Sequence, residues 1–290
     1  MSTAAAVEKA ITERAMLVTL SIAYWTAKVG DESVVTELTN KHKTERSAHE
    51  YKKVLIDPAP LNVLKAIRSR ARAYHFNITR PWIDGGTRVL PSAFYMEYAA
   101  KIQEFRNEYE TACADFFKNY PKYKGEARKR LGDLFDEADY PTAEALRRKF
   151  AFDMRVLPIP AAGDWRVDLG AKGNAEMRKQ IEATLLQAAE VVTMDNWQRL
   201  HAVVSHLAER VKTSDAVLRD SLVINIKEIC AVMDKMNITG DKALAAMTKT
   251  VEKELCSIDV AAMRDDPALK AEAGDAADAI LAKMAAYIGA

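Results

Sequence analysis

Apolar positions along most of this chain recur every three or four residues, which is the spacing of one face of an α-helix. The clearest stripe follows Ser92, the expected N-cap, and extends to Pro121. The pattern predicts a helix over residues 92–120 whose stripe another helix must cover. Pro121 and Gly125 then interrupt the helix. The stripe consists of Phe94, Tyr98, Ile102, Phe105, Tyr109, Ala112, Phe116 and Tyr120.

The same spacing predicts helices along most of the remaining chain. Glycine and proline are scarce, at 11 and 9 of 290 residues, and good helix formers dominate, so the composition excludes an all-β protein. Thr213-Ser214-Asp215 is expected to cap one of the later helices. The predicted helices cover residues 4–28, 61–76, a short basic segment after Gly125 to about Leu134, 172–211, a segment after the 213–215 cap, 241–256 and 267–288.

The period changes to two between Phe150 and Leu169. Apolar and polar residues alternate from Phe150 to Val156, and again from Trp165 to Leu169, on either side of a proline-rich turn. This predicts a two-stranded β-hairpin over residues 150–170. Prolines make its tip pre-ordered, so the tip is a candidate contact point formed by Pro158, Ile159, Pro160 and Trp165.

These elements together predict a mainly α protein. We expect an elongated helical bundle with long amphipathic, coiled-coil-like helices and one small two-stranded β-hairpin. The long stripes offer more apolar surface than a hairpin alone covers, so self-association is expected. Within one elongated domain we distinguish an N-terminal helical segment, a basic and aromatic-rich helical region, the hairpin and a C-terminal helical region, at residues 1–57, 58–149, 150–170 and 171–290.

The composition bounds the compartment. Hydrophobic residues make up 49% of the chain, which is ample for a buried core. The apolar run Ala15–Ala27 is shorter than the ~20 residues of a membrane span, and it lacks a basic leader and a cleavage site. Cys113, Cys230 and Cys256 cannot form a complete disulfide set, which favours buried free thiols. We expect a protein of the cytosol without stable membrane insertion.

No motif indicates a catalytic, cofactor or metal site. Asp136–Asp139 spells a helicase motif, but the glycine-rich phosphate loop that a nucleotide-driven enzyme needs is missing from the sequence. His201 and His206 are five residues apart, about 140° around a helix, which does not suit a shared zinc ion. We therefore expect a non-enzymatic protein without cofactors. An enzyme assembled from dispersed residues and a membrane-active protein remain alternatives.

The charge of the chain is uneven. Residues 61–130 hold 14 Lys and Arg against 7 Asp and Glu, whereas the remaining residues hold 28 against 34. Arginines interleaved with aromatic rings in this basic region are typical of a single-stranded nucleic-acid surface. A solvated helix face and a protein interface explain the same pattern. The candidate contact residues are Arg68, Arg70, Arg72, Tyr74, Arg80 and Trp82.

Several short motifs carry a family resemblance. They are Arg72–His75, Thr79–Trp82, Arg88–Pro91, Phe135–Pro141, Phe150–Asp153 and Gly163–Leu169. Over roughly residues 13–255 the sequence resembles an uncharacterised domain-of-unknown-function family of bacteriophages and integrative mobile elements. Its members are often encoded beside a MoxR-type AAA+ ATPase that resembles the cobalt-chelatase subunit, and near recombination genes.

The resemblance implies a context and no catalytic residues. We expect a phage or mobile-element protein of the bacterial host cytosol that acts as an adaptor, scaffold or client of such an ATPase. The alternative is a single-stranded nucleic-acid-binding protein acting in recombination or replication.

Overall fold

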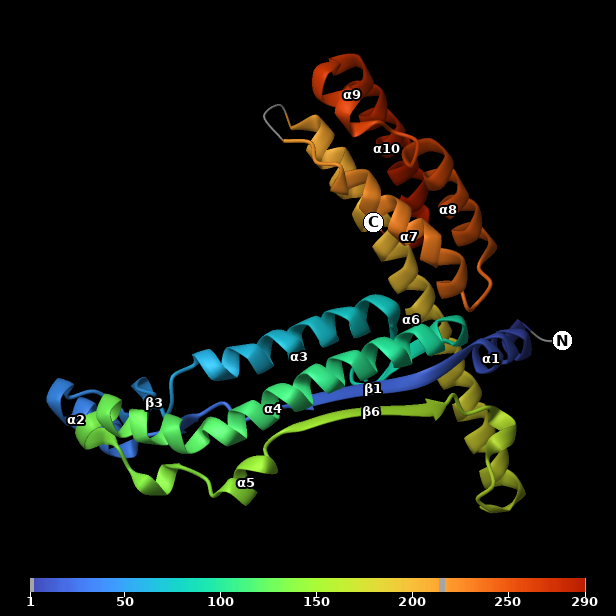
Figure 1. Ribbon diagram of the computed structural model, residues 1–290. Helices are drawn as coiled ribbons and strands as arrows, with labels where there is room; N and C mark the ends of the chain where they lie inside the picture. The colour runs from blue at the N-terminus through green and yellow to red at the C-terminus, as the bar shows by residue number, and fades with distance from the viewer. Residues whose placement is uncertain (1–2, 214–216, 290) are drawn as a thin grey trace. The chain divides into compact units, whose positions relative to one another are not determined.

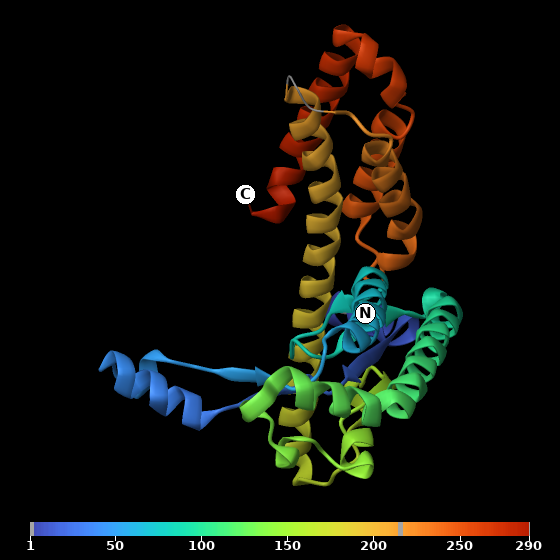
Figure 2. The ribbon, with the colours of Figure 1, turned by 60° about the vertical axis from the view of Figure 1, so that its left-hand side comes forward.

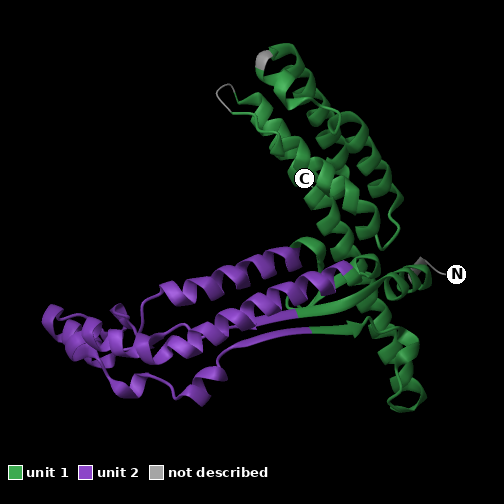
Figure 3. Cartoon of the chain, in the orientation of Figure 1, with its two compact units in different colours: residues 1–19, 77–96, 155–290 green, residues 20–76, 97–154 purple. Residues whose placement is uncertain are grey.

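A computed structural model describes residues 3–213 and 217–289 and shows a mainly α protein with a small antiparallel sheet. The chain forms two compact units, each assembled from segments far apart in sequence (Figure 3). Unit 1 comprises residues 1–19, 77–96 and 155–290, and unit 2 comprises residues 20–76 and 97–154. Among the described residues, no helix combines the length and the apolarity needed to cross a membrane.

Unit 2 is built around two long helices, α3 (Ala59–Ile78) and α4 (Tyr95–Leu131), which run side by side in opposite directions (Figure 1). The α3 helix begins after Asp57, whose Oδ1 accepts a hydrogen bond from the Ala59 amide at 2.7 Å. The remaining elements of this unit are β2 (Lys28–Gly30), α2 (Glu32–His42), η1 (Arg46–Ala48), β3 (Lys52–Val54), η3 (Gly132–Leu134), η4 (Glu137–Asp139) and α5 (Ala143–Arg147).

An ion cluster around buried Lys53 stabilises the short antiparallel β2–β3 strand pair of unit 2. The Nζ atom of Lys53 lies 3.1 Å from Asp31 Oδ2 and 2.7 Å from Asp139 Oδ2. Asp31 also caps α2, since its Oδ1 accepts from the amides of Ser33 and Val34. The hydrogen bonds from Ser33 and Lys53 lower the pKa of Asp31 to about 2.

The four-stranded sheet has the order β4-β5-β1-β6. Its strands are β1 (Ala15–Ala23), β4 (Arg80–Pro81), β5 (Arg88–Pro91) and β6 (Ala151–Pro158). Ala15 lies opposite Pro91 in the antiparallel β1–β5 pair, and Arg80 lies opposite Val89 in the β4–β5 pair. In unit 1 the sheet packs with α1 (Thr3–Arg14) and α6 (Gly170–Lys212) through Ile11, Leu17, Trp82, Val89, Ile159, Leu185, Ala188 and Val192.

The remaining helices of unit 1 form a bundle with the C-terminal half of α6 (Figure 2). The ring of Trp197 on α6 stacks on Tyr287 with centroids 4.4 Å apart, and its Nε1 donates to Asp241 at 3.1 Å. These contacts join three elements that are distant in sequence. The additional helices are α7 (Ser221–Met236), α8 (Lys242–Leu255), α9 (Val260–Asp265) and α10 (Pro267–Ile288), and η2 (Ser92–Phe94) and η5 (Ala162–Asp164) are short 3₁₀ turns.

The helix predicted over residues 4–28 is wrong beyond Arg14. The α1 helix ends there, and Ala15–Ala23 forms β1, the strand between β5 and β6 in the sheet. A short apolar run containing Val18, Thr19 and Ile22 suits a strand as well as a helix, and pairing with the distant β5 decides between them.

The predicted 150–170 hairpin is also wrong. Its first half is the strand β6, but β6 lies beside β1, and residues 165–169 form no strand. The turn between the halves is the 3₁₀ segment η5, and the amide of Ala162 donates to Glu8 Oε1 of α1 at 2.8 Å. Alternation identified the strand correctly, but it carries no information about the pairing partner.

The predicted stripe of residues 92–120 is confirmed as core, because all its members except Ala112, which is half-buried, are buried. Its cover includes strands as well as a helix, since the Tyr109 hydroxyl donates to the Ala23 carbonyl at 2.5 Å. Pro121 does not end the helix: α4 continues to Leu131 with Pro121 exposed, and Tyr120 and Ala127 on either side of it are buried. Ser214 and Asp215 of the predicted helix cap lie outside the described residues.

Candidate partner-binding groove

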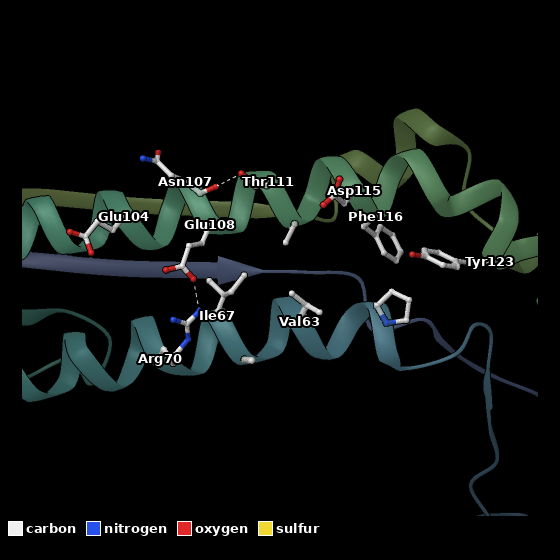
Figure 4. Close-up of a pocket in the computed structure, with 13 residues that line it drawn as sticks. Val63, Ile67, Arg70, Glu104, Asn107, Glu108, Thr111, Asp115, Phe116 and Tyr123 are labelled. Carbon is white, nitrogen blue, oxygen red and sulfur yellow. Dashed lines mark hydrogen bonds and ion pairs between the residues drawn. The ribbon is translucent and has the colours of Figure 1, made fainter.

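A groove of about 1020 Å³ lies between α3 and α4, entirely within unit 2 (Figure 4). On α3 it is lined by positions 60, 63, 66, 67 and 70, and on α4 by positions from 104 to 123 that lie on one face. Ile67 from the buried face of α3 and Phe116 from the buried stripe of α4 reach into the groove, and exposed and half-buried residues beside those two faces complete its lining.

The floor of the groove is apolar. Ile67 and Phe116 are buried there, whereas the Val63 side chain is 54% exposed. Ala66 and Ala112 add only methyl groups, which keeps the space between the helices open. An exposed valine in a large apolar concavity is typical of a binding surface.

The rim of the groove is polar and mostly acidic. Glu104, Glu108 and Asp115 line it from α4, and Arg70 is its one cationic lining residue. Arg70 pairs with Glu108 across the groove, as the dashed line in Figure 4 shows. Glu104 pairs with Lys101 on its own helix at 2.6 Å. Asp115 has no ion-pair partner among the residues that the structure describes.

The groove contains only one of the predicted nucleic-acid contacts, Arg70. Arg68 and Arg72 lie on another face of α3 and are half-buried, and their guanidinium groups cover the rings of Tyr24 and Phe76 at 5.6 and 5.5 Å. Each arginine therefore already has an aromatic partner within unit 2.

Tyr74, another predicted contact, faces the protein interior. Its ring stacks on Tyr98 with centroids 6.1 Å apart and an interplanar angle of 11°. Burial, together with the charges of Glu97 and Glu104, raises the pKa of Tyr74 to about 12. The Tyr98 hydroxyl lies 2.7 Å from His75 Nδ1. The Tyr74 ring therefore packs against other protein rings, whereas a residue of a nucleic-acid-binding surface would expose its ring to stack on a base.

Arg80 and Trp82 belong to unit 1, and both are buried. Arg80 Nε donates to Asn196 Oδ1 at 2.5 Å and lies 3.2 Å from Asp195 Oδ2, so the arginine fixes β4 to α6. Arg199 donates to the same carboxylate at 2.6 Å. Burial and the charge of Arg199 are the main causes that lower the pKa of Arg80 to about 9, so Arg80 stays charged at neutral pH.

The residues predicted as a hairpin tip differ in how far they are buried. Ile159 is buried in the core of unit 1, whereas Pro158 and Pro160 on either side of it are exposed. Trp165 is half-buried, and its Nε1 is buried without a hydrogen-bond partner among the described residues. The four residues form no projecting tip, because the hairpin itself does not form.

The groove residues escaped the sequence reasoning for a physical reason. Val63, Ala66 and Arg70 recur at steps of three and four beside the buried face of α3, and Glu104, Glu108 and Asp115 recur at steps of four and seven beside the buried stripe of α4. That spacing was visible, but it does not tell which helix lies opposite. Among the described residues, no group of histidine, cysteine and acidic side chains is placed to hold a metal ion.

Comparison with protein-family models, with curated proteins and with solved structures gave no match. The geometry of the groove therefore carries the functional conclusion.

Proposed function

We propose that this chain is a non-enzymatic interaction protein whose α3–α4 groove binds a segment of a protein partner. The observation that supports this proposal is the open apolar floor, with Val63 exposed at its centre and a polar rim around it. An apolar core surrounded by polar residues is the usual anatomy of a protein interface.

The family resemblance suggests the first partner to test, a MoxR-type AAA+ ATPase of a phage or mobile element. In that setting the chain acts as an adaptor, scaffold or client in the bacterial host cytosol. A second copy of the chain is the other partner to test, because self-association is expected from its long amphipathic helices.

A groove-filling substitution tests the proposal. Ala112→Trp places an indole in the groove, and Ala114→Trp places one on the same helix about 200° away, at an exposed position outside the groove. Both variants are first compared with the parent protein by circular dichroism and thermal unfolding. Each is then immobilised and exposed to purified ATPase and to host lysate, and captured proteins are identified and re-tested in purified form.

We expect at least one direct partner to bind the parent protein and Ala114→Trp and to lose binding to Ala112→Trp. Light scattering gives the same comparison for self-association. Partners that bind all three proteins equally, or a parent protein that binds none and stays monomeric, would overturn the proposal.

A further inference from the structure

We infer that the partner segment is a basic amphipathic helix, and that it binds by displacing Arg70 from Glu108. This inference rests on the proposed function of the groove and adds the chemistry of its occupant.

The dimensions of the groove suit a helix. Its α3 wall from Pro60 to Arg70 is about 15 Å long, and its α4 wall from Glu104 to Tyr123 about 28 Å, at 1.5 Å per residue. A helix of roughly 10 to 19 residues spans these lengths. Such a helix buries apolar side chains at positions i, i+3 or i+4, and i+7 on a floor of this kind.

The charge of the groove indicates that the bound helix carries positive charge. Three carboxylates and one guanidinium line it, which gives a net charge of −2 at neutral pH. All three carboxylates belong to α4, so this edge of the groove is acidic from Glu104 to Asp115, although Glu104 is paired with Lys101. The basic residues Arg68 and Arg72 lie outside the lining, on rings of unit 2. A partner with Lys or Arg beside its apolar stripe complements this edge.

The Arg70–Glu108 pair is the contact that such a helix replaces. The pair crosses the groove from α3 to α4, and its side chains are 55% and 45% exposed. An exposed ion pair contributes little to stability, so its loss is a small cost of binding. A cationic side chain of the partner then takes the place of Arg70 beside Glu108, and the apolar floor opens to the partner.

This arrangement predicts in which direction an Arg70 substitution changes partner affinity. Arg70→Gln leaves the rim more negative and removes a competitor for Glu108, so it strengthens the binding of a basic helix. A single-stranded nucleic acid carries negative charge, and the same substitution weakens its binding. Arg72→Gln is the matched control, because Arg72 lies on the same helix outside the groove lining.

Two labelled synthetic helices serve as probes, both 18 residues long and hydrocarbon-stapled. They share leucines at positions i, i+4 and i+7, and their polar positions are lysine in one and glutamate in the other. Fluorescence anisotropy at low salt measures their binding to the full-length parent protein, to Arg70→Gln, Arg72→Gln and Asp115→Asn, and to the two tryptophan variants. An oligothymidine of matched length is measured in parallel.

We expect the lysine helix to bind about tenfold more tightly than the glutamate helix, with the preference falling as salt rises. Arg70→Gln tightens lysine-helix binding about two- to fivefold, Asp115→Asn weakens it by a similar factor, and Arg72→Gln leaves it unchanged. Ala112→Trp abolishes binding of the lysine helix, whereas Ala114→Trp retains it.

The outcomes separate the inference from the proposed function. If both helices bind equally and Ala112→Trp abolishes both, the groove is a helix site but the charge selection is wrong. A glutamate preference, or weaker lysine-helix binding by Arg70→Gln, likewise overturns the inference alone. If neither helix binds, or Ala112→Trp changes nothing, the helix-binding groove itself is refuted. Arg70-dependent binding of the oligothymidine favours the nucleic-acid alternative.

Discussion

Asp195→Asn tests whether the arginine cluster of unit 1 is structural. The substitution keeps the shape of the side chain and removes the negative charge that Arg80 and Arg199 share at 3.2 and 2.6 Å. Arg80 is 1% exposed, so its charge is not rescued by water once the carboxylate is gone.

The expected loss follows from burial. Breaking a fully buried ion pair costs about 3–5 kcal/mol. The Asp195 side chain is 22% exposed and Arg199 is 26% exposed, so we reduce the expected loss to about 2–3 kcal/mol. For a unit of this size the loss corresponds to a decrease in Tm of about 5–10 °C.

Thermal and urea unfolding measure this loss. Both are monitored by tryptophan fluorescence, because buried Trp82 and Trp197 report on unit 1. Asp234→Asn on an exposed face of α7 is the control and stays within about 0.5 kcal/mol of the parent protein. Adding Arg80→Met to Asp195→Asn removes the uncompensated charge and recovers part of the loss. A loss below about 0.5 kcal/mol for Asp195→Asn would refute a structural role for the cluster.

Four further predictions address unit 2 and the thiols. Lys53→Met leaves two carboxylates unpaired and lowers the urea midpoint of unit 2. In the parent protein the stabilisation contributed by Asp31 is complete above the ordinary Asp pKa of about 3.9 and is lost as pH falls through about 2. The difference in stability between the parent protein and Asp31→Asn, measured by unfolding between pH 2 and 5, tests this. Tyr109→Phe removes a hydrogen bond to a strand carbonyl and costs about 1–2 kcal/mol in urea unfolding; an unchanged midpoint would show that the bond is dispensable. Burial raises the pKa of Cys113 to about 11 and that of Cys230 to about 12. A thiol reagent at pH 8 is therefore expected to label at most one of the three cysteines in the native protein and all three in urea. Rapid labelling of two cysteines in the native protein would contradict this.

Helices could be predicted from the sequence where the signal is local. The three-and-four spacing identified the buried stripe of α4, and it placed α6 at residues 172–211, where the helix covers Gly170–Lys212. Helical hydrogen bonds join residues four apart, so a short window of sequence contains the information. Strand pairing depends on distant residues, so the local pattern predicts a helix where β1 forms and the wrong partner for β6.

The site was harder to predict than the fold for the same reason. Arg80 follows a basic helix in sequence, but its partners Asp195 and Asn196 lie more than a hundred residues away on α6. A pattern of charges along the sequence therefore could not predict that Arg80 is buried. The groove likewise requires the face of α3 and the face of α4 to meet, and periodicity describes each face alone.

Site-specific photo-crosslinking from Val63 tests the binding of a partner in the α3–α4 groove most directly. A photoreactive amino acid at this exposed groove position is compared in cells with one at Ile224, a similarly exposed position on α7 of unit 1. We predict that mass spectrometry will identify a specific adduct from position 63 on a basic amphipathic helix of the partner, with no such adduct from position 224. The same adducts from both positions, or none from position 63, would contradict it.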